Sequence, residues 1–142
     1  MILRLLSVQI VKFWDIIKYA IGQVEKIGSD EEINVYNRLF AALLSDKAQC
    51  FIAFDDDGVR AVCITEIKYD ELIAIKSIHL RCLYAFKSAH NDVWIKDFNF
   101  IKNLAQQEKC SKITFETSNP RIKSIARDIG AIEVSTNLMV EV

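Results

Sequence analysis

The run from Leu72 to Phe86, LIAIKSIHLRCLYAF, constrains the fold more than any other part of the chain. Near its two ends both faces of a strand built from it are apolar, so we expect the strand to be central in a sheet whose two faces are both covered. Its middle is polar, and Ser77, His79 and Arg81 share one face by strict alternation. Such a patch indicates a cavity, a bulge or a splayed edge. The run therefore predicts a central strand covered on both faces.

Two further strands are expected at 49–54 and 59–68, on either side of the sequence DDDG. The aspartates and the glycine of that sequence, residues 55–58, are typical of a tight hairpin turn. A calcium loop needs greater length and a regular spacing of ligands, which this turn does not have. We interpret the three aspartates as turn and surface residues, and we expect no metal site.

The N-terminal region predicts a short strand, Ile2–Leu6, followed by an amphipathic helix that ends near Ile27–Gly28. Charged residues interrupt the apolar sequence before it reaches the length of a bilayer, so no membrane span is expected. A helix lying on a membrane surface stays open as an alternative. The apolar stripe of the helix comprises Ile10, Phe13, Trp14, Ile17 and Ile21.

A second helix is expected after the sequence SDEE, residues 29–32, which has the spacing of a capping box. In such a box Ser29 bonds forward to the backbone and Glu32 bonds back. The core-facing residues expected on this helix are Ile33, Tyr36, Phe40, Leu43 and Leu44.

The C-terminal half predicts a helix from Asn91 or Asp92 to Lys109 and a strand at 112–117. Asn119 and Pro120 have the order of an N-cap and a first helical residue, and the short helix that they open should end at Gly130. AIEV and LMVEV are expected to form two last strands. The order β-α-α-β-β-β-α-β-α-β-β predicts an α/β (α+β) domain with a mixed sheet of about six to seven strands and four helices.

Composition limits the possible functions. A chain of 142 residues fits one domain, residues 1–142, and a net charge of −1 gives no basic field for nucleic acid. The four cysteines show no metal-binding spacing and fall mostly in apolar runs. We expect them to be reduced and buried, which indicates a cytoplasmic location.

The order of elements, and above all the stretch NLAQQEKCSKITFETSNPRIKSIARDIGAIEV, resembles the GNAT superfamily of acyl-CoA-dependent N-acetyltransferases. Ala105, Asn119 and Gly130 hold places of the superfamily pattern. The likeness covers nearly the whole chain, although a sequence Asn–helix–Gly is also ordinary capping chemistry. The C-terminal stretch is also similar to short phage-encoded GNAT-like proteins, some of them virion proteins, and this likeness implies a virion or the host cytoplasm as the location.

Two departures from the GNAT pattern bear on activity. The resemblance places a pyrophosphate-binding loop, R/Q-x-x-G-x-G/A, at residues 89–94, where this chain has Ala89, Asp92 and Trp94. A carboxylate there repels pyrophosphate, and we expect the indole to fill the space. The tyrosine that protonates the leaving thiolate in many GNAT enzymes is Ala126 here.

Two functions follow from the resemblance. One is a non-catalytic binding or structural module, without a cofactor, that holds a protein partner or self-associates. The other is an active N-acetyltransferase that binds acetyl-CoA through Tyr84, Phe86, Asn91 and Asn119, with His79 as the general base. In the first reading His79 and Arg81 form only a hydrogen-bonded polar patch.

Overall fold

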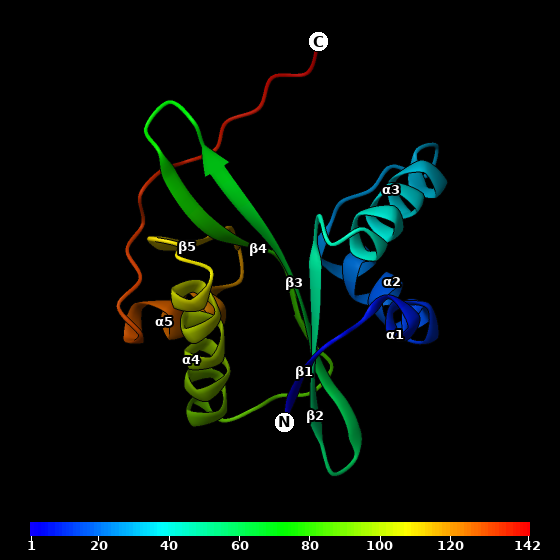
Figure 1. The fold of residues 1–142 in the computed structure, drawn as a ribbon, viewed down its shortest axis with the longest axis horizontal. Helices are drawn as coiled ribbons and strands as arrows, with labels where there is room; N and C mark the ends of the chain where they lie inside the picture. The colour runs from blue at the N-terminus through cyan, green and yellow to red at the C-terminus, as the bar shows by residue number, and fades with distance from the viewer.

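The computed structural model describes residues 1–142 and is built on one mixed sheet with the strand order β1-β2-β3-β4-β5 (Figure 1). The pairs β1–β2, β2–β3 and β3–β4 are antiparallel, and β5 is parallel to β4. The fold class is therefore confirmed as mixed α+β. The strands are β1 (Ile2–Arg4), β2 (Gln49–Asp55), β3 (Gly58–Asp70), β4 (Ile75–Ala85) and β5 (Lys112–Phe115).

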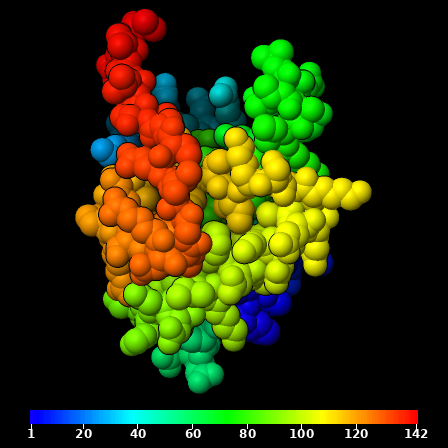
Figure 2. Space-filling view, turned by 90° about the vertical axis from the view of Figure 1, so that its left-hand side faces the viewer, coloured from blue at the N-terminus to red at the C-terminus, as the bar shows by residue number.

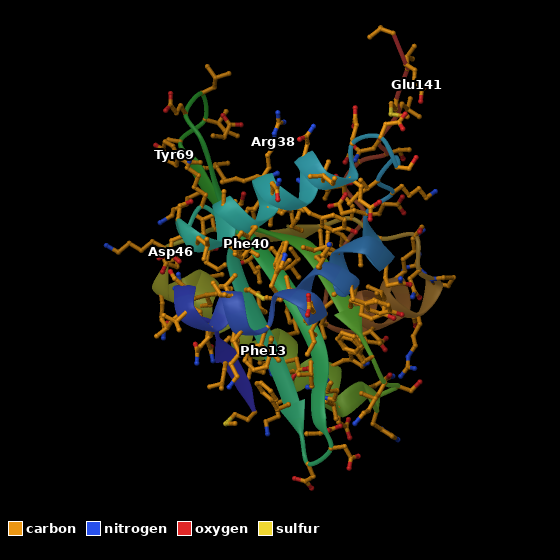
Figure 3. All side chains as sticks on the ribbon, turned by 90° about the vertical axis from the view of Figure 1, so that its right-hand side faces the viewer. Phe13, Arg38, Phe40, Asp46, Tyr69 and Glu141 are labelled. Atoms are coloured by element: carbon orange, nitrogen blue, oxygen red, sulfur yellow. The ribbon has the colours of Figure 1, made fainter.

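Helices cover both faces of the sheet. Figure 1 shows α1, α2 and α3 on one side and α4 and α5 on the other. Figure 3 views the first of these faces, with the three N-terminal helices in front of the strands. β4 is thus an interior strand with helices on both faces of the sheet, as predicted, although the middle strand is β3. The helices are α1 (Ser7–Lys12), α2 (Trp14–Val24), α3 (Glu32–Leu44), α4 (Asn91–Gln107) and α5 (Pro120–Asp128).

Strand alternation divides the core between these two faces. On β2, Cys50 and Ile52 belong to the core formed with α1, α2 and α3. Phe51 points the other way and packs edge-on against Phe100 of α4, with 5.7 Å between ring centroids. The sheet therefore separates two apolar layers.

The structure corrects the N-terminal half in three places. The first predicted helix is divided at Phe13, and its second part ends at Val24 because Glu25 already has extended backbone, so Gly28 does not stop it. The capping box at 29–32 is wrong: α3 begins only at Glu32, after a turn in which the Glu31 N–H donates to the Gly28 carbonyl. Ile33 then falls on the outer face, 76% exposed.

The long strand is shorter than predicted at its start. β4 begins at Ile75, and residues 71–74 form the tip of the β3–β4 hairpin, where Ala74 has a positive φ of 54°. Leu72 is consequently almost fully exposed. Apolar sequence alone did not show where the chain reverses.

The last two predicted strands, AIEV and LMVEV, are wrong, and the sheet has five strands rather than six or seven. The chain does turn at Gly130, which has a φ of +92°, and the Ala131 N–H donates to the Ala126 carbonyl. Beyond Ala131 the residues have no regular secondary structure. The outer edge of β5 consequently has no strand beside it.

All four cysteines are free, as expected. Cys50 and Cys82 are buried, and desolvation raises the pKa of each thiol to about 12. They therefore remain protonated and act as small apolar core residues. None of the helices combines the length and the apolarity needed to cross a bilayer.

Candidate functional site

The parallel strands β4 and β5 pair over only part of their length. Ser77 to Leu80 of β4 align with Lys112 to Phe115 of β5, and the pairing ends there while β4 continues to Ala85. The sheet splays at this point, as the sequence predicted. From Arg81 to Ala85, the side of β4 that faces away from β3 has no β5 partner. An extended ligand can form hydrogen bonds with the backbone N–H and C=O groups of this edge.

A β-bulge marks the point of separation. Ile64 of β3 pairs with Cys82 and Thr65 pairs with Leu80, so Arg81 is an extra residue in β4. Its Nε donates to Oε1 of Glu25, just after α2, at 2.7 Å. Its Nη1 also lies 3.7 Å from Oε1 of Glu66. The bulge or splayed edge that the polar middle of this strand predicted is therefore present.

His79 lies two residues before the bulge residue Arg81, and its side chain contacts β5. Its Nδ1 is 2.9 Å from Oγ1 of Thr114 on β5. Burial lowers the pKa of His79, and the charge of Lys68 lowers it further, against the opposing effect of Glu66. The imidazole is consequently neutral near pH 7 and can accept a proton.

Tyr84 and Phe86 pack against each other near the far end of β4, with 5.1 Å between ring centroids. Tyr19 of α2 packs against both, at 6.0 Å from each ring. Burial raises the pKa of Tyr84, and Tyr19 contributes to the shift. These two predicted cofactor residues thus lie beside the splayed edge, but their rings are engaged with α2.

The overall architecture has known counterparts. A crystal structure of a probable acetyltransferase superposes with a TM-score of 0.77 at 12% identity and covers 100% of this chain and 97% of its own. A ribosomal-protein-alanine N-acetyltransferase from Brucella melitensis biovar Abortus 2308 gives 0.72 at 12% identity, covering 100% of this chain and 99% of its own. A predicted acetyltransferase with acetyl-CoA from Clostridium acetobutylicum gives 0.74 at 12% identity, covering 99% and 95%.

This chain has the GNAT fold. No protein-family model and no curated protein matches its sequence. At 12% identity the likeness establishes the fold alone, and any catalytic or binding role depends on the residues of this chain.

Residues 89–94, which the sequence resemblance aligns with the GNAT pyrophosphate loop, comprise the end of the β4–α4 connection and the first turn of α4. His90 is the N-cap of α4 and provides no side-chain cap, while Asn91 and Asp92 are exposed in the first turn. The nearby basic groups are engaged: Lys87 Nζ lies 3.2 Å from Asp55, and the Arg121 guanidinium donates to the Ala89 carbonyl. Of the predicted cofactor residues, Asn91 alone lies at this helix start.

The predicted place of the Trp94 indole was wrong. Trp94 lines an apolar cavity between the sheet, α4 and α5, and its Nε1 is buried. The indole thus packs under α4, one turn into the helix, and does not fill the loop. Asp92 is exposed at the loop position, in the first turn of α4.

Asn119 is confirmed as the N-cap of α5. Its Oδ1 accepts from the Arg121 N–H at 2.9 Å and lies 3.5 Å from the Ile122 nitrogen. As a candidate cofactor residue it therefore has its carbonyl oxygen already occupied by its own helix.

Ala126, where the sequence resemblance places the acid of GNAT enzymes, is 7% exposed and lines the same cavity as Trp94. This cavity has a volume of about 90 Å³, and none of its lining residues carries a hydroxyl. Its one charged lining residue, Asp97, is paired with Arg60 at 2.7 Å. The space near Ala126 is therefore mostly apolar and offers no hydroxyl group to a departing thiolate.

The structure thus brings His79 and Arg81 together with residues that sequence reasoning did not find, namely Glu25, Glu66 and Thr114. Strand pairing places Glu66 opposite His79, and the fold alone brings Glu25 to the bulge. Local patterns carry no signal for such distant partners. No group of three or more His, Cys, Asp and Glu side chains is placed to hold a metal ion.

Proposed function

We propose that this chain is a GNAT-fold binding module that holds a protein partner and does not transfer acetyl groups. The observation that carries the proposal is Asp92, whose side chain is exposed in the first turn of α4. The free N–H groups at the start of a helix attract anions. A carboxylate in the first turn provides a negative charge there, so a bound phosphate is not needed for that purpose. A pyrophosphate at this position would meet a fixed like charge.

The surroundings of Ala126 support the same conclusion. A thiolate leaving group needs a proton, and the apolar cavity beside Ala126 has no hydroxyl to supply one. Water can serve instead, so this feature adds to the argument from Asp92 without replacing it. Acetyl-CoA therefore fits the chain in one part only: the β4 edge suits an extended amide chain, whereas the start of α4 does not suit the pyrophosphate.

Exposed apolar side chains favour a protein partner. The tip of the β3–β4 hairpin presents Tyr69, Leu72 and Ile73, each more than half exposed. Exposed apolar side chains that gather at one place on a surface are typical of interaction sites. A cytoplasmic location, in the host of a phage or otherwise, and a virion role remain predictions from the sequence resemblance.

His79 favours a second candidate function, an active N-acetyltransferase. The neutral imidazole next to the unpaired β4 edge is suited to accept a proton from an amine nucleophile. Acetyl-CoA would supply the acyl group, with Tyr84, Phe86 and Asn91 beside the edge along which it would lie. Asn119 would take part through its side-chain N–H groups, since its Oδ1 caps α5.

A transfer assay separates the two candidates. The chain would be incubated with acetyl-CoA and a panel of amines (polyamines, N-terminal peptides and an aminoglycoside), and thiol release would be followed. We expect release no faster than with acetyl-CoA alone. Release that depends on an amine, is lost in His79→Gln and persists in His90→Gln would instead establish the enzyme.

A further inference from the structure

The splay of the sheet leaves a wedge between residues 81–85 of β4 and residues 116–119, which follow β5. β5 ends at Phe115, whereas β4 continues to Ala85. No backbone hydrogen bond joins the two sides of this wedge. A strand edge with unpaired N–H and C=O groups is a template for another extended chain. The wedge therefore offers β4 as a pairing edge for one added strand.

Strand alternation determines what the side chains of an added strand would meet. Adjacent strands direct their side chains to the same two faces of a sheet. On β4, Tyr84 packs against Tyr19 of α2, whereas Leu83 lines the cavity under α4 and α5. The side chains of an added strand would consequently alternate between an α2 face and an α4–α5 face.

On the α4–α5 face the wedge adjoins the apolar cavity. Leu83, Trp94, Phe115 and Ile122 line the cavity there. Figure 2 views the molecule from this side, with α4 and α5 lying over the strands. The cavity volume of about 90 Å³ is smaller than the about 150 Å³ of an apolar cavity that holds benzene. A small aliphatic side chain such as that of valine therefore suits this face better than an aromatic one.

The α2 face of the wedge carries carboxylates. Glu25 lies 2.7 Å and Glu66 lies 3.7 Å from the guanidinium of Arg81. Phe115 lines the cavity on the opposite face, so alternation places Glu116 on the α2 face. Glu116 is exposed and forms no ion pair.

The charges that border the wedge are predominantly acidic. The three carboxylates of the α2 face lie near two cations, Arg81 and Lys68, and both cations are already paired. At the start of α4, Asp92 is exposed and has no ion pair. The two cations nearby, Lys87 and Arg121, already have partners. The charges left without a partner are therefore negative, and they complement basic side chains.

We propose that the wedge binds one extended segment of a protein partner in which small apolar side chains alternate with basic ones. The main chain of the segment pairs with residues 81–85 of β4. Its apolar side chains enter the cavity under α4 and α5, and its basic side chains meet Glu116 and the other carboxylates of the α2 face. This inference rests on the proposed function, because acyl-CoA would occupy the same β4 edge, and it adds the chemistry of the partner.

Fluorescence anisotropy with a labelled, capped hexapeptide of alternating lysine and valine tests the inference on the full chain. We expect saturable binding, and binding weaker by about tenfold or more for a block peptide of the same composition, because only alternation separates the two kinds of side chain. Glu116→Lys should weaken binding of the alternating peptide by about tenfold or more. Glu71→Lys, the same change of charge at the exposed tip of the β3–β4 hairpin, should leave it unchanged.

Backbone amide NMR signals locate the bound peptide. Shifts concentrated in residues 81–85 and 116–119 support the inference. Absence of binding, equal binding of the block peptide, equal binding by Glu116→Lys, or shifts confined to other residues would each overturn it.

Competition with acetyl-CoA separates this inference from the proposed function. Displacement of the bound peptide by micromolar acetyl-CoA would contradict the proposed function and would still support peptide binding in the wedge. A chain that binds neither the alternating peptide nor acetyl-CoA would overturn this inference and leave the proposed function standing.

Discussion

The Arg60 guanidinium lies 2.7 Å from the carboxylate of Asp97 and ties a bulge in β3 to the inner face of α4. Ala53 pairs with Ala61 and Phe54 with Val59, so Arg60 is the extra residue of the bulge. Both side chains are largely buried, and the second nitrogen, Nη1, has no partner. This pair fixes α4 over the sheet close to the splay.

Removing the carboxylate should be strongly destabilising. Asp97→Ala leaves a guanidinium buried without its counter-charge, which costs about 3–5 kcal/mol of unfolding free energy. Asp57→Ala is the matched control, since Asp57 pairs with Lys87 on the surface at 3.6 Å; its cost should stay below about 1 kcal/mol. Urea unfolding measures both. A cost for Asp97→Ala no larger than that of the control would show that the pair does not hold α4.

His79 should titrate at unusually low pH. In the variant His90→Gln it is the one remaining histidine, and its imidazole signals can be followed by NMR. We expect a pKa below the usual 6.5, because burial disfavours the charged ring. An observed pKa above 6.5 would mean that Glu66 outweighs burial and Lys68.

The same shift predicts how stability depends on pH. Because the folded pKa is lower than the unfolded one, the unfolded chain takes up the proton first as the pH falls. The contribution of His79 is fully present above about pH 6.5 and is lost as the pH falls from there to the folded pKa. The unfolding free energy of His79→Gln should therefore fall less steeply below pH 6.5 than that of the parent chain.

Asn119 should act as a helix cap. Asn119→Ala removes the acceptor of the Arg121 N–H and should cost about 1 kcal/mol, whereas Asn119→Asp should retain most of it. Ser118→Ala, one residue earlier, is the control. Thermal unfolding of the three variants measures these differences. Equal stability of Asn119→Ala and the parent would leave a ligand-binding role as the better account of this residue.

Asp92 should stabilise α4 and oppose phosphate at the same time. Asp92→Asn removes a favourable charge from the first turn and should lower the unfolding free energy by about 0.3–1 kcal/mol. It should also increase the affinity for acetyl-CoA relative to the parent chain. Asp30→Asn makes the same change of net charge at an exposed site away from α4 and should alter neither quantity. Unchanged acetyl-CoA affinity in Asp92→Asn would mean that this loop position is not the site of repulsion.

The sequence predicted the centre of the fold better than its ends. The apolar faces of β4, its polar middle and the caps of α5 depend on residues near one another in the chain, so local patterns reveal them. The boundaries at Gly28 and Ser29 were wrong because a glycine or a serine can end or cap a helix only where the backbone leaves it, and α2 ends earlier while α3 begins later.

Long-range relationships could not be predicted in the same way. Residues 132–142 have the alternation of a strand, but alternation does not say whether they pair with the open edge of β5. Likewise, nothing near His79 in the sequence indicates that Thr114 will lie beside it. The residues of the polar cluster on β4 were therefore predicted, whereas Glu25 after α2, Glu66 on β3 and Thr114 on β5 were missed.

The central claim is that this chain has the GNAT fold but does not bind acyl-CoA. Calorimetric titration of the parent chain with acetyl-CoA tests it most directly. The proposed function predicts no binding heat at micromolar cofactor and at most weak binding in the millimolar range. Saturable binding with a low-micromolar dissociation constant would contradict it and would establish the chain as an acyl-CoA-binding protein.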